Sequence, residues 1–348
     1  MIHSNNNYTV LVTGGSGFIA CHCILKLLQQ GYVVRTTLRS MNRREEVKQM
    51  LRTGGIASFD NLSFVEANLS DDKNWNEAVK GCDYVLHVAS PTPAIQFTHE
   101  DELIVPAKEG VLRVLTAARE AAVKRVVLTS AFGAIGMGHK KRTTPYTEND
   151  WTNINSNIHA YQKSKTLSEK AAWDFIENEG GSLELSTVNP VAVMGPVLGA
   201  DYSHSHQMIR QMLEGKIKAC PKISSCYVDV RDVADLHLLA MTDPKAKGER
   251  FLATIGAALS TLEVAKILRR RLGADAEKVP VKELPNWSLR LAATSNPSLK
   301  MLVTLLGQYM QASGDKAKQL LNWNPRSNED AIIATAESLL KLGLVKIK

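Results

Sequence analysis

Short apolar runs alternate with longer segments in which apolar residues recur every three or four positions along the first half of the chain. The short runs predict strands, and the longer segments, of which Leu103–Ala121 is the clearest, predict amphipathic helices. The predicted strands are Thr9–Thr13, Val33–Leu38, Leu62–Ala67, Tyr84–Val88, Val126–Thr129 and Leu185–Val188. Because strands and helices alternate, the pattern predicts an α/β fold with a doubly wound parallel sheet covered by helices on both faces.

This alternation ends after Val188, where a turn-rich segment begins. Helical patterns then dominate, at Met208–Leu213, Leu262–Leu272, within Leu289–Met310 and at Asp330–Leu342. Before the second of these helices the chain is expected to return to the sheet, near residues 226–245. We predict a sheet domain at residues 1–190, joined by that return, and a smaller, mostly helical domain at residues 191–348.

Charge and composition exclude several classes of protein. The formal net charge of +7 comes from Lys266–Lys348, which holds 14 basic and 7 acidic residues. Its densest run, Arg269–Arg271, spreads around a helix rather than forming a stripe, so we predict a solvated surface and no nucleic-acid partner. The five cysteines, an odd number, predict reduced thiols rather than a disulfide framework or a metal cluster.

The sequence also lacks the features of a membrane protein. No stretch has the roughly 18 uncharged apolar residues that a membrane-spanning helix needs. The polar N-terminal stretch MIHSNNNY does not resemble a signal peptide. We therefore expect a cytoplasmic protein with no membrane partner.

A cluster of glycines follows the first predicted strand, in the stretch TVLVTGGSGFIA at residues 9–20. The spacing Gly15-x-Gly17-x-x-Ala20 places small residues where the strand turns into a helix, which is expected to begin near Ser16. Glycine permits the close approach that a phosphate needs, and a helix N-terminus attracts anions. The stretch therefore predicts a Rossmann-like dinucleotide site. The predicted cofactor contacts here are Gly14, Gly17, Phe18 and Ile19.

The end of the second predicted strand carries the residues that distinguish NADP from NAD. A carboxylate at this place binds the ribose 2'-hydroxyl of NAD, whereas an arginine accepts the 2'-phosphate of NADP. The sequence has Arg39 here, followed by Arg43 and Arg44, and no acidic residue before Glu45. Because a guanidinium binds a phosphate through paired hydrogen bonds, we predict that these arginines select NADP(H).

The strongest catalytic candidates lie in the stretch NIHAYQKSKTLSEKAAW. Tyr161 and Lys165 are four residues apart on a predicted helix and therefore project from one face. A nearby ammonium stabilises a phenolate, so Lys165 is expected to lower the pKa of Tyr161. Tyr161 would then protonate a carbonyl oxygen as hydride reaches its carbon, while Lys165 assists and holds the nicotinamide ribose.

Motifs along nearly the whole chain resemble those of the extended short-chain dehydrogenases/reductases, and more closely the dihydroflavonol 4-reductase-like group. They are VTGGSGFIA, GCDYVLHVASP, KRVVLTSAFGAIG, YQKSK, VNPVAVMGP, YVDVRDVADLHLLAM and KAKQLLNWNPRS, in that order. The group also contains cinnamoyl-CoA reductases and microbial aldehyde and ketone reductases. The resemblance implies an NADPH-binding sheet domain, a C-terminal substrate domain and a serine-tyrosine-lysine catalytic group.

The resemblance also implies further cofactor contacts, position by position. They are Asn68 and Leu69 beside the adenine, Val88, Ala89 and Ser90 at the central phosphates and ribose, and Pro190 and Val193 at the nicotinamide. Asn68 departs from the family, in which an aspartate is usual. An asparagine side chain still forms hydrogen bonds at this place.

A second departure concerns the catalytic serine. In the stretch LTSAFG, Ala131 stands where the resemblance implies a serine that hydrogen-bonds the substrate carbonyl. Loss of such a donor costs about 3 kcal/mol of transition-state stabilisation. We expect Thr129 or Ser130 to supply a hydroxyl instead, with Thr129 favoured because alternate residues of a strand share a face. The alternative is that Tyr161 polarises the carbonyl alone.

Substrate selectivity is expected to come from three segments, at residues 90–93, 132–135 and 202–208. The predicted substrate contacts are Pro91, Phe132, Ala134, Tyr202 and His206. These largely apolar and aromatic side chains favour a hydrophobic aldehyde or ketone over a sugar nucleotide. The stretch NIHAYQK replaces the characteristic run of cinnamoyl-CoA reductases, which argues against a thioester substrate. His204 and His206 lack partner ligands, so no metal site is predicted.

We therefore predict an enzyme, an NADPH-dependent reductase of aldehydes or ketones, with Tyr161 as proton donor and Lys165 assisting. The sequence leaves a monomer and a homodimer equally open. One alternative is a non-catalytic NADP(H)-binding redox sensor, which the intact Tyr161 and Lys165 argue against and which Ala131 keeps open. The other is a sugar-nucleotide epimerase or steroid dehydrogenase on the same fold, which firmly retained NAD would support and Arg39 opposes.

Overall fold

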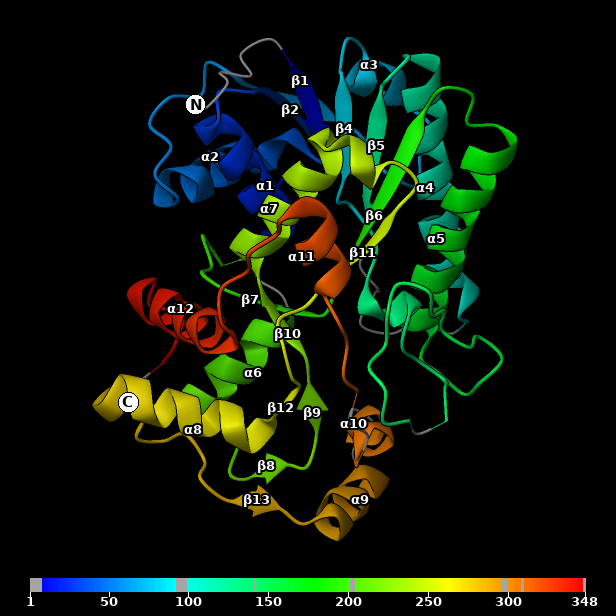
Figure 1. The fold of residues 1–348 in the computed structure, drawn as a ribbon. Helices are drawn as coiled ribbons and strands as arrows, with labels where there is room; N and C mark the ends of the chain where they lie inside the picture. Colours follow the sequence, from blue (N-terminus) through cyan, green and yellow to red (C-terminus); the bar gives the residue numbers. More distant parts are fainter. Residues whose placement is uncertain are drawn as a thin grey trace.

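A seven-stranded parallel sheet forms the centre of the molecule. The computed structural model describes residues 8–91, 99–140, 142–200, 204–295, 299–307 and 310–346. The strand order is β11-β6-β5-β4-β1-β2-β3. The strands are β1 (Thr9–Val12), β2 (Val33–Leu38), β3 (Leu62–Glu66), β4 (Tyr84–His87), β5 (Arg125–Thr129), β6 (Glu184–Pro190) and β11 (Arg250–Ala253). This order confirms the predicted Rossmann-like, doubly wound sheet (Figure 1).

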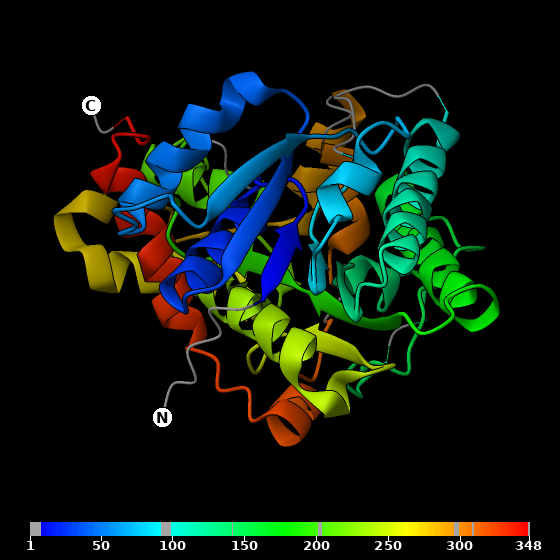
Figure 2. The ribbon, with the colours of Figure 1, turned by 90° about the horizontal axis from the view of Figure 1, so that it is seen from above.

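Helices cover both faces of the sheet (Figures 1 and 2). The first seven are α1 (Phe18–Gln29), α2 (Arg44–Thr53), α3 (Trp75–Val79), α4 (Asp101–Glu120), α5 (Ala160–Asn178), α6 (His204–Leu213) and α7 (Val230–Thr242). The remaining five are α8 (Thr261–Leu272), α9 (Asn286–Ser295), α10 (Lys300–Leu305), α11 (Asp315–Leu321) and α12 (Asn328–Lys341). Helices α4 and α5 pack together on one face, and α1 and α7 pack together on the other.

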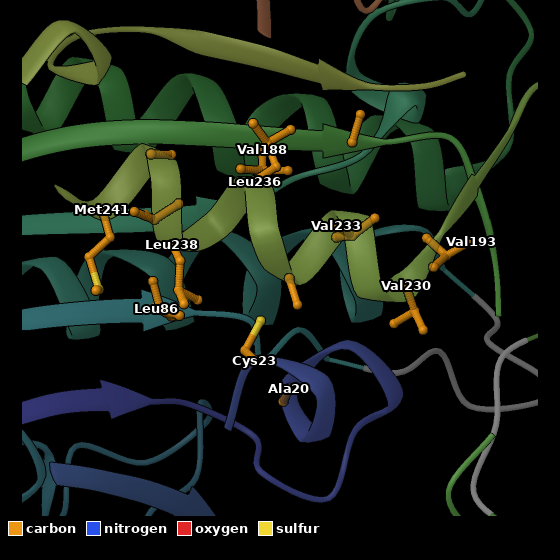
Figure 3. Close-up of a cluster of buried hydrophobic side chains, with 14 of the residues drawn as sticks. Ala20, Cys23, Leu86, Val188, Val193, Val230, Val233, Leu236, Leu238 and Met241 are labelled. Atoms are coloured by element: carbon orange, nitrogen blue, oxygen red, sulfur yellow. The ribbon is translucent and has the colours of Figure 1, made fainter. Parts of the chain in front are cut away.

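Alternate residues of the central strands enter different hydrophobic cores. Val126 of β5 joins α4 through Val111, whereas its neighbour Val127 joins the core that contains Val233 of α7. Both strands β4 and β5 are buried at every position, as expected for strands covered on both faces. Figure 3 shows the α7 side, where Leu236 and Met241 lie with residues of α1, β4 and β6.

The chain after residue 190 builds a smaller region below the sheet in Figure 1. Short strands pair there, namely β7 (Ala192–Met194) with β10 (Tyr227–Asp229), β8 (Cys220–Pro221) with β13 (Glu283–Leu284), and β9 (Ser224–Ser225) with β12 (Leu259–Ser260). A third core joins α6, α8 and α12 through Ile209, Leu268 and Ile332. The chain returns to the large sheet through α7 and β11, and the boundary between the two predicted domains stays a prediction.

Several elements differ from the sequence-based expectation. Helix α1 begins at Phe18 rather than near Ser16, and α6 begins at residue 204 rather than at Met208. Strand β11 and helix α11 were not expected at all. The β11 segment, RFLA, carries no alternating pattern of its own, and its four residues are buried because they pair with β6 and are covered by α11.

Candidate active site

A cleft of about 1660 Å³ lies at the carboxyl ends of the parallel strands. The residues that follow β1, β2, β3, β4 and β5 line one part of it, and residues from the smaller region line the other. The cleft crosses the boundary between β1 and β4, where the strand order changes direction. Ligands of doubly wound sheets bind at this place, because the turns that leave the strands diverge there.

The glycine turn forms one wall of the cleft. Gly14 has φ 71°, and its N–H donates to Thr37 Oγ1 over 3.0 Å. A Cβ at Gly14 would stand 3.0 Å from Cβ of Ala89, and a Cβ at Gly15 would stand 2.2 Å from Oγ1 of Thr36. The turn therefore has room only for glycine. Helix α1 follows with Gly17 as its N-cap, no side chain capping it and no acidic residue in its first turn, which leaves its N-terminus suited to a phosphate.

The three predicted arginines occupy different surroundings. Arg39 is exposed, lines the cleft, and forms no hydrogen bond or ion pair with any described residue. Arg43 also lines the cleft, but its guanidinium binds both carboxylate oxygens of Glu46 at 2.8 and 2.9 Å and donates to Ser16 Oγ at 2.8 Å. Arg44 lies outside the cleft lining, in an ion pair with Glu45. Arg39 is thus the arginine with an open guanidinium.

The other predicted cofactor residues also line this half of the cleft. They are Phe18, Ile19, Asn68, Leu69, Val88, Ala89, Ser90, Pro190 and Val193. Asn68 Oδ1 accepts from the N–H of Ser70 over 3.2 Å, so the side chain shapes its own turn. The N–H of Ala89 donates to Thr13 Oγ1 over 3.0 Å, which holds the end of β4 against β1.

Helix α5 places Tyr161 and Lys165 on one side of the cleft. His159 starts the helix by accepting the N–H of Tyr161 on Nδ1. Tyr161 remains 36% exposed and lines the cleft, whereas Lys165 is buried behind it, with Nζ 3.5 Å from the carbonyl oxygen of Thr129. The two residues therefore lie on successive turns of one helix, as their spacing predicted, but only Tyr161 lines the cleft.

Burial shifts the pKa values of both Tyr161 and Lys165. Enclosure by the cleft wall raises the pKa of the Tyr161 hydroxyl above its usual value, and burial lowers the pKa of Lys165 to about 8. The nearby Glu169 carboxylate opposes the shift at Lys165. The direction at Tyr161 is opposite to the expected lowering, because burial disfavours the charged phenolate. A raised pKa keeps Tyr161 protonated at neutral pH, which suits a proton donor.

The hydroxyls of Thr129 and Ser130 face away from the cleft. Nδ1 of His237 lies 2.7 Å from the Val233 carbonyl oxygen and donates to it, so Nε2 accepts the hydroxyl of Thr129 over 2.7 Å. Ser130 donates its hydroxyl to Glu169. Neither residue lines the cleft, whereas Ala131 does. Thr129 and Ser130 instead line a separate cavity of about 10 Å³ beside Lys165.

The predicted substrate residues are only partly brought together. Pro91 and Phe132 line the cleft. Ala134 and His206 are fully buried and do not: His206 Nε2 lies 3.2 Å from the carbonyl oxygen of Gly195, and its ring packs edge-on against Phe18. Tyr202 lies outside the described residues. His206 therefore points from α6 into the protein interior and not into the cleft.

Tyr146 is another aromatic residue in the cleft wall, and it was not expected from the sequence. Its ring packs edge-on against Phe132 at 5.7 Å, and the guanidinium of Arg142 lies 3.6 Å from its centroid on the ring face. Tyr146 pairs with the distant 310–313 segment, since its N–H donates to the carbonyl oxygen of Gln311 over 2.8 Å. Its hydroxyl has no hydrogen-bond partner among the described residues. An isolated tyrosine in a polar loop carries no periodic pattern by which to find it.

Two kinds of feature are absent from the described part of the chain. It contains no cluster of three or more His, Cys, Asp or Glu side chains able to hold a metal ion. None of its helices is long and apolar enough to cross a bilayer. The five cysteines, including Cys226 in the cleft wall, are free thiols.

A parallel sheet with a glycine turn, an open arginine and a Tyr–Lys pair at its carboxyl edge defines a nicotinamide-dependent oxidoreductase. Residues 10–254 match the model of the NAD dependent epimerase/dehydratase family. The chain belongs to that family, and it is an NAD(P)-dependent reductase of the extended short-chain dehydrogenase/reductase type predicted from its motifs.

Individual relatives agree with this assignment. The chain is 34% identical to a cinnamoyl-CoA reductase, CAD2, of Medicago truncatula, over 97% of this chain and 98% of that protein. It is 31% identical to a dihydroflavonol 4-reductase of Gerbera hybrida, over 75% and 72% of the two chains. The yeast methylglyoxal/isovaleraldehyde reductase Gre2, solved in complex with NADPH, superimposes with a TM-score of 0.80 at 26% identity, over 96% of this chain and 99% of that one.

Proposed function

We propose that this protein reduces an aldehyde or ketone to an alcohol with NADPH, and that Tyr161 donates the proton. The observation that carries the proposal is Tyr161 in the wall of a cleft that the glycine turn and Arg39 also line, with Lys165 buried one helical turn behind it. The part of the cleft with the glycine turn and Arg39 suits a dinucleotide, and the part with Tyr161 exposes a hydroxyl that can donate a proton. Both parts belong to one continuous cleft, so a cofactor and a substrate could bind side by side.

The glycine turn and the unpartnered Arg39 support NADPH. The glycines pack the turn tightly against Ala89 and Thr36, and Gly14 and Gly17 line the cleft beside the uncapped N-terminus of α1, which suits a pyrophosphate. Arg39 carries a charge that no described side chain neutralises, which suits a 2'-phosphate. Arg43 already holds Glu46, so its contribution is secondary to that of Arg39. When bound, the reduced nicotinamide supplies a hydride to the carbonyl carbon.

The protein's own residues then manage the proton. Tyr161 gives its hydroxyl proton to the carbonyl oxygen as that oxygen becomes negative, and solvent later returns a proton to the phenolate. Lys165, charged below a pH of about 8, stabilises that phenolate. The alcohol product keeps both the hydride and the proton from Tyr161.

The two hydroxyls that were expected to assist Tyr161 are both engaged away from the cleft. The hydroxyl protons of Thr129 and Ser130 are given to His237 and Glu169, so neither replaces the serine lost at Ala131 without breaking a buried hydrogen bond. We therefore favour the alternative in which Tyr161 polarises the carbonyl alone. Such a site is expected to be a slower catalyst than one with a second donor.

The substrate side favours an uncharged, hydrophobic carbonyl compound. Phe132, Met137, Tyr146, Leu305 and Met310 line it. The relatives named above are a reductase of a thioester, of a dihydroflavonol and of small aldehydes. Because the run typical of cinnamoyl-CoA reductases is absent here, we place a free aldehyde or ketone ahead of a thioester.

The test is oxidation of NADPH, and separately of NADH, against aldehydes, ketones, diketones and one acyl-CoA thioester, with Tyr161→Phe as control. Rapid oxidation of NADPH that the control abolishes is the expected result. NADPH binding without turnover of any carbonyl would overturn the proposal in favour of a redox sensor. Retention of NAD by the purified protein would instead support an epimerase or steroid dehydrogenase. Size-exclusion chromatography decides between monomer and homodimer.

A further inference from the structure

Glu169 occupies an unusual place for a carboxylate. It lies on α5 one turn beyond Lys165 and two turns beyond Tyr161, and it is fully buried. Residues four apart on a helix are neighbours on one face. A buried carboxylate is costly unless hydrogen bonds and an opposite charge compensate for its lost hydration. Such a group in the helix that carries the candidate catalytic pair requires an explanation.

Glu169 has partners from three neighbouring strands, and Trp173 of its own helix also donates to Oε1, over 3.5 Å. Ser130, directly after β5, donates to Oε2, and Asn189 of β6 donates to the same oxygen over 2.7 Å. Arg250 of β11 donates Nε–H to Oε1 over 2.7 Å. The Nδ2 of Asn189 also lies 3.4 Å from the carbonyl oxygen of Ala131, in the cleft wall. Glu169 thus ties α5 to the strand ends from which the cleft floor is built.

The surroundings of Lys165 leave Glu169 as the negative charge that acts on it. No described carboxylate forms an ion pair with Lys165, so Glu169 acts through space rather than by direct contact. Of the other groups nearby, burial lowers the pKa of His87 on β4 to about 3 and that of His237 on α7 to about 4, so both are neutral at assay pH. Arg250 is permanently charged and held by Glu169.

We propose that Glu169 is a positioning residue for the Tyr161–Lys165 pair, whose carboxylate keeps Lys165 cationic and fixes α5 against the strand ends. This inference rests on the proposed function, since it assigns the charge on which the proton transfer depends. Burial alone would favour a neutral amine at Lys165. Glu169 offsets that tendency while its own hydrogen bonds hold it in place.

The test is the pH dependence of kcat in Glu169→Gln, which keeps the shape and removes the charge. In the native protein kcat is expected to fall above a pH of about 8, where Lys165 loses its proton. In the variant the pKa of Lys165 drops further, so the fall should move about one pH unit lower. Glu169→Asp, which retains the charge, should return the profile towards the native one.

The matched control is Thr187→Val. Thr187 donates to Glu169 Oε1 over 3.3 Å from β6, so this variant disturbs the same cluster without changing its charge. Its pH profile should match the native one. A Glu169→Gln enzyme that is slower at every pH, with an unmoved profile, would overturn the proposal and leave Glu169 a purely structural residue.

Two further measurements test the proposal if Glu169→Gln does not fold or if the native protein reduces no carbonyl compound. Removal of one partner of a buried ion pair strands the other, so Glu169→Gln alone can fail to fold. The double variant E169Q/R250M removes both charges. Because loss of Arg250 also removes a positive charge that disfavours a cationic Lys165, its pH profile should move in the same direction as that of Glu169→Gln but less far, and an unmoved profile would overturn the proposal. If the native protein binds NADPH but reduces nothing, the proposed function fails. In that case the pH dependence of NADPH affinity, measured by fluorescence, still reports the charge of Lys165 in the native protein and in Glu169→Gln.

Discussion

The two sides of the cleft are built in different ways. The nucleotide side consists of turns that directly follow β1, β2, β3 and β4, and backbone hydrogen bonds hold them together. The N–H of Gly15 donates to the carbonyl oxygen of Thr37, and the N–H of Thr13 donates to that of Leu86. The substrate side assembles side chains from segments as distant as Phe132, Tyr146 and Met310. Nucleotide binding thus depends on local backbone geometry, and substrate binding on long-range packing.

Because of this difference, mutations on the two sides should affect different properties of the enzyme. A change on the nucleotide side should alter cofactor affinity without altering the choice of substrate. A change on the substrate side should do the reverse. Tyr161 lies where the two sides meet. Its hydroxyl should therefore affect kcat but neither the affinity for the cofactor nor the affinity for the substrate.

The largest effect is expected from Tyr161→Phe. Removal of the proton donor should lower kcat by about 10³-fold, because general acid catalysis contributes 10²–10⁴-fold. NADPH affinity, measured by fluorescence titration, should not change. Tyr146→Phe is the matched control, since it removes the same hydroxyl from another tyrosine of the cleft. Retained turnover in Tyr161→Phe would show that another group donates the proton.

Arg39→Gln should have the next largest effect. Loss of charge-assisted hydrogen bonds to the 2'-phosphate should weaken NADPH binding about 50-fold, while NADH binding stays the same. Arg44→Gln, which changes an arginine outside the cleft lining, should leave both affinities unaltered. Equal losses for NADPH and NADH in Arg39→Gln would contradict a phosphate-binding role.

Ala131→Ser should raise kcat about tenfold. The new hydroxyl lies in the cleft wall and supplies a second donor to the carbonyl oxygen, and removal of one such donor from enzymes costs 10²–10³-fold. Steady-state kinetics with the best carbonyl substrate measure the gain. Ala131→Val adds bulk without a donor and serves as the control. An unchanged or lower kcat in the serine variant would mean that the carbonyl already has its full set of donors.

Tyr146→Phe should have the smallest effect. Tyr146 lines the cleft and its hydroxyl has no partner among the described residues, so its removal should raise KM about fivefold for substrates with a second polar group, at unchanged kcat. Substrates without that group should show no change. A fall in kcat for all substrates would place Tyr146 in the chemistry and remove the distinction between the two sides.

Much of the nucleotide side could be read from the sequence. The glycines, Arg39 and the Tyr161–Lys165 spacing each encode their geometry within a few residues, because a turn or a helix face is set by near neighbours. Arg44 shows the limit of such reasoning. It follows Arg43 directly, yet it points to Glu45 and away from the cleft, since the helix that begins there rotates successive side chains apart.

The hydroxyl partners and the substrate wall were decided by the tertiary structure. Thr129 faces His237 and Ser130 faces Glu169 because helices α7 and α5 bring those acceptors to opposite faces of the sheet. Tyr146 reaches the cleft through a backbone pairing with a segment more than 160 residues away. The sequence by itself determined the parallel sheet, the glycine turn and the spacing of the catalytic pair. Which side chains meet in the substrate pocket depended on packing between distant segments, and no local periodicity carries that information.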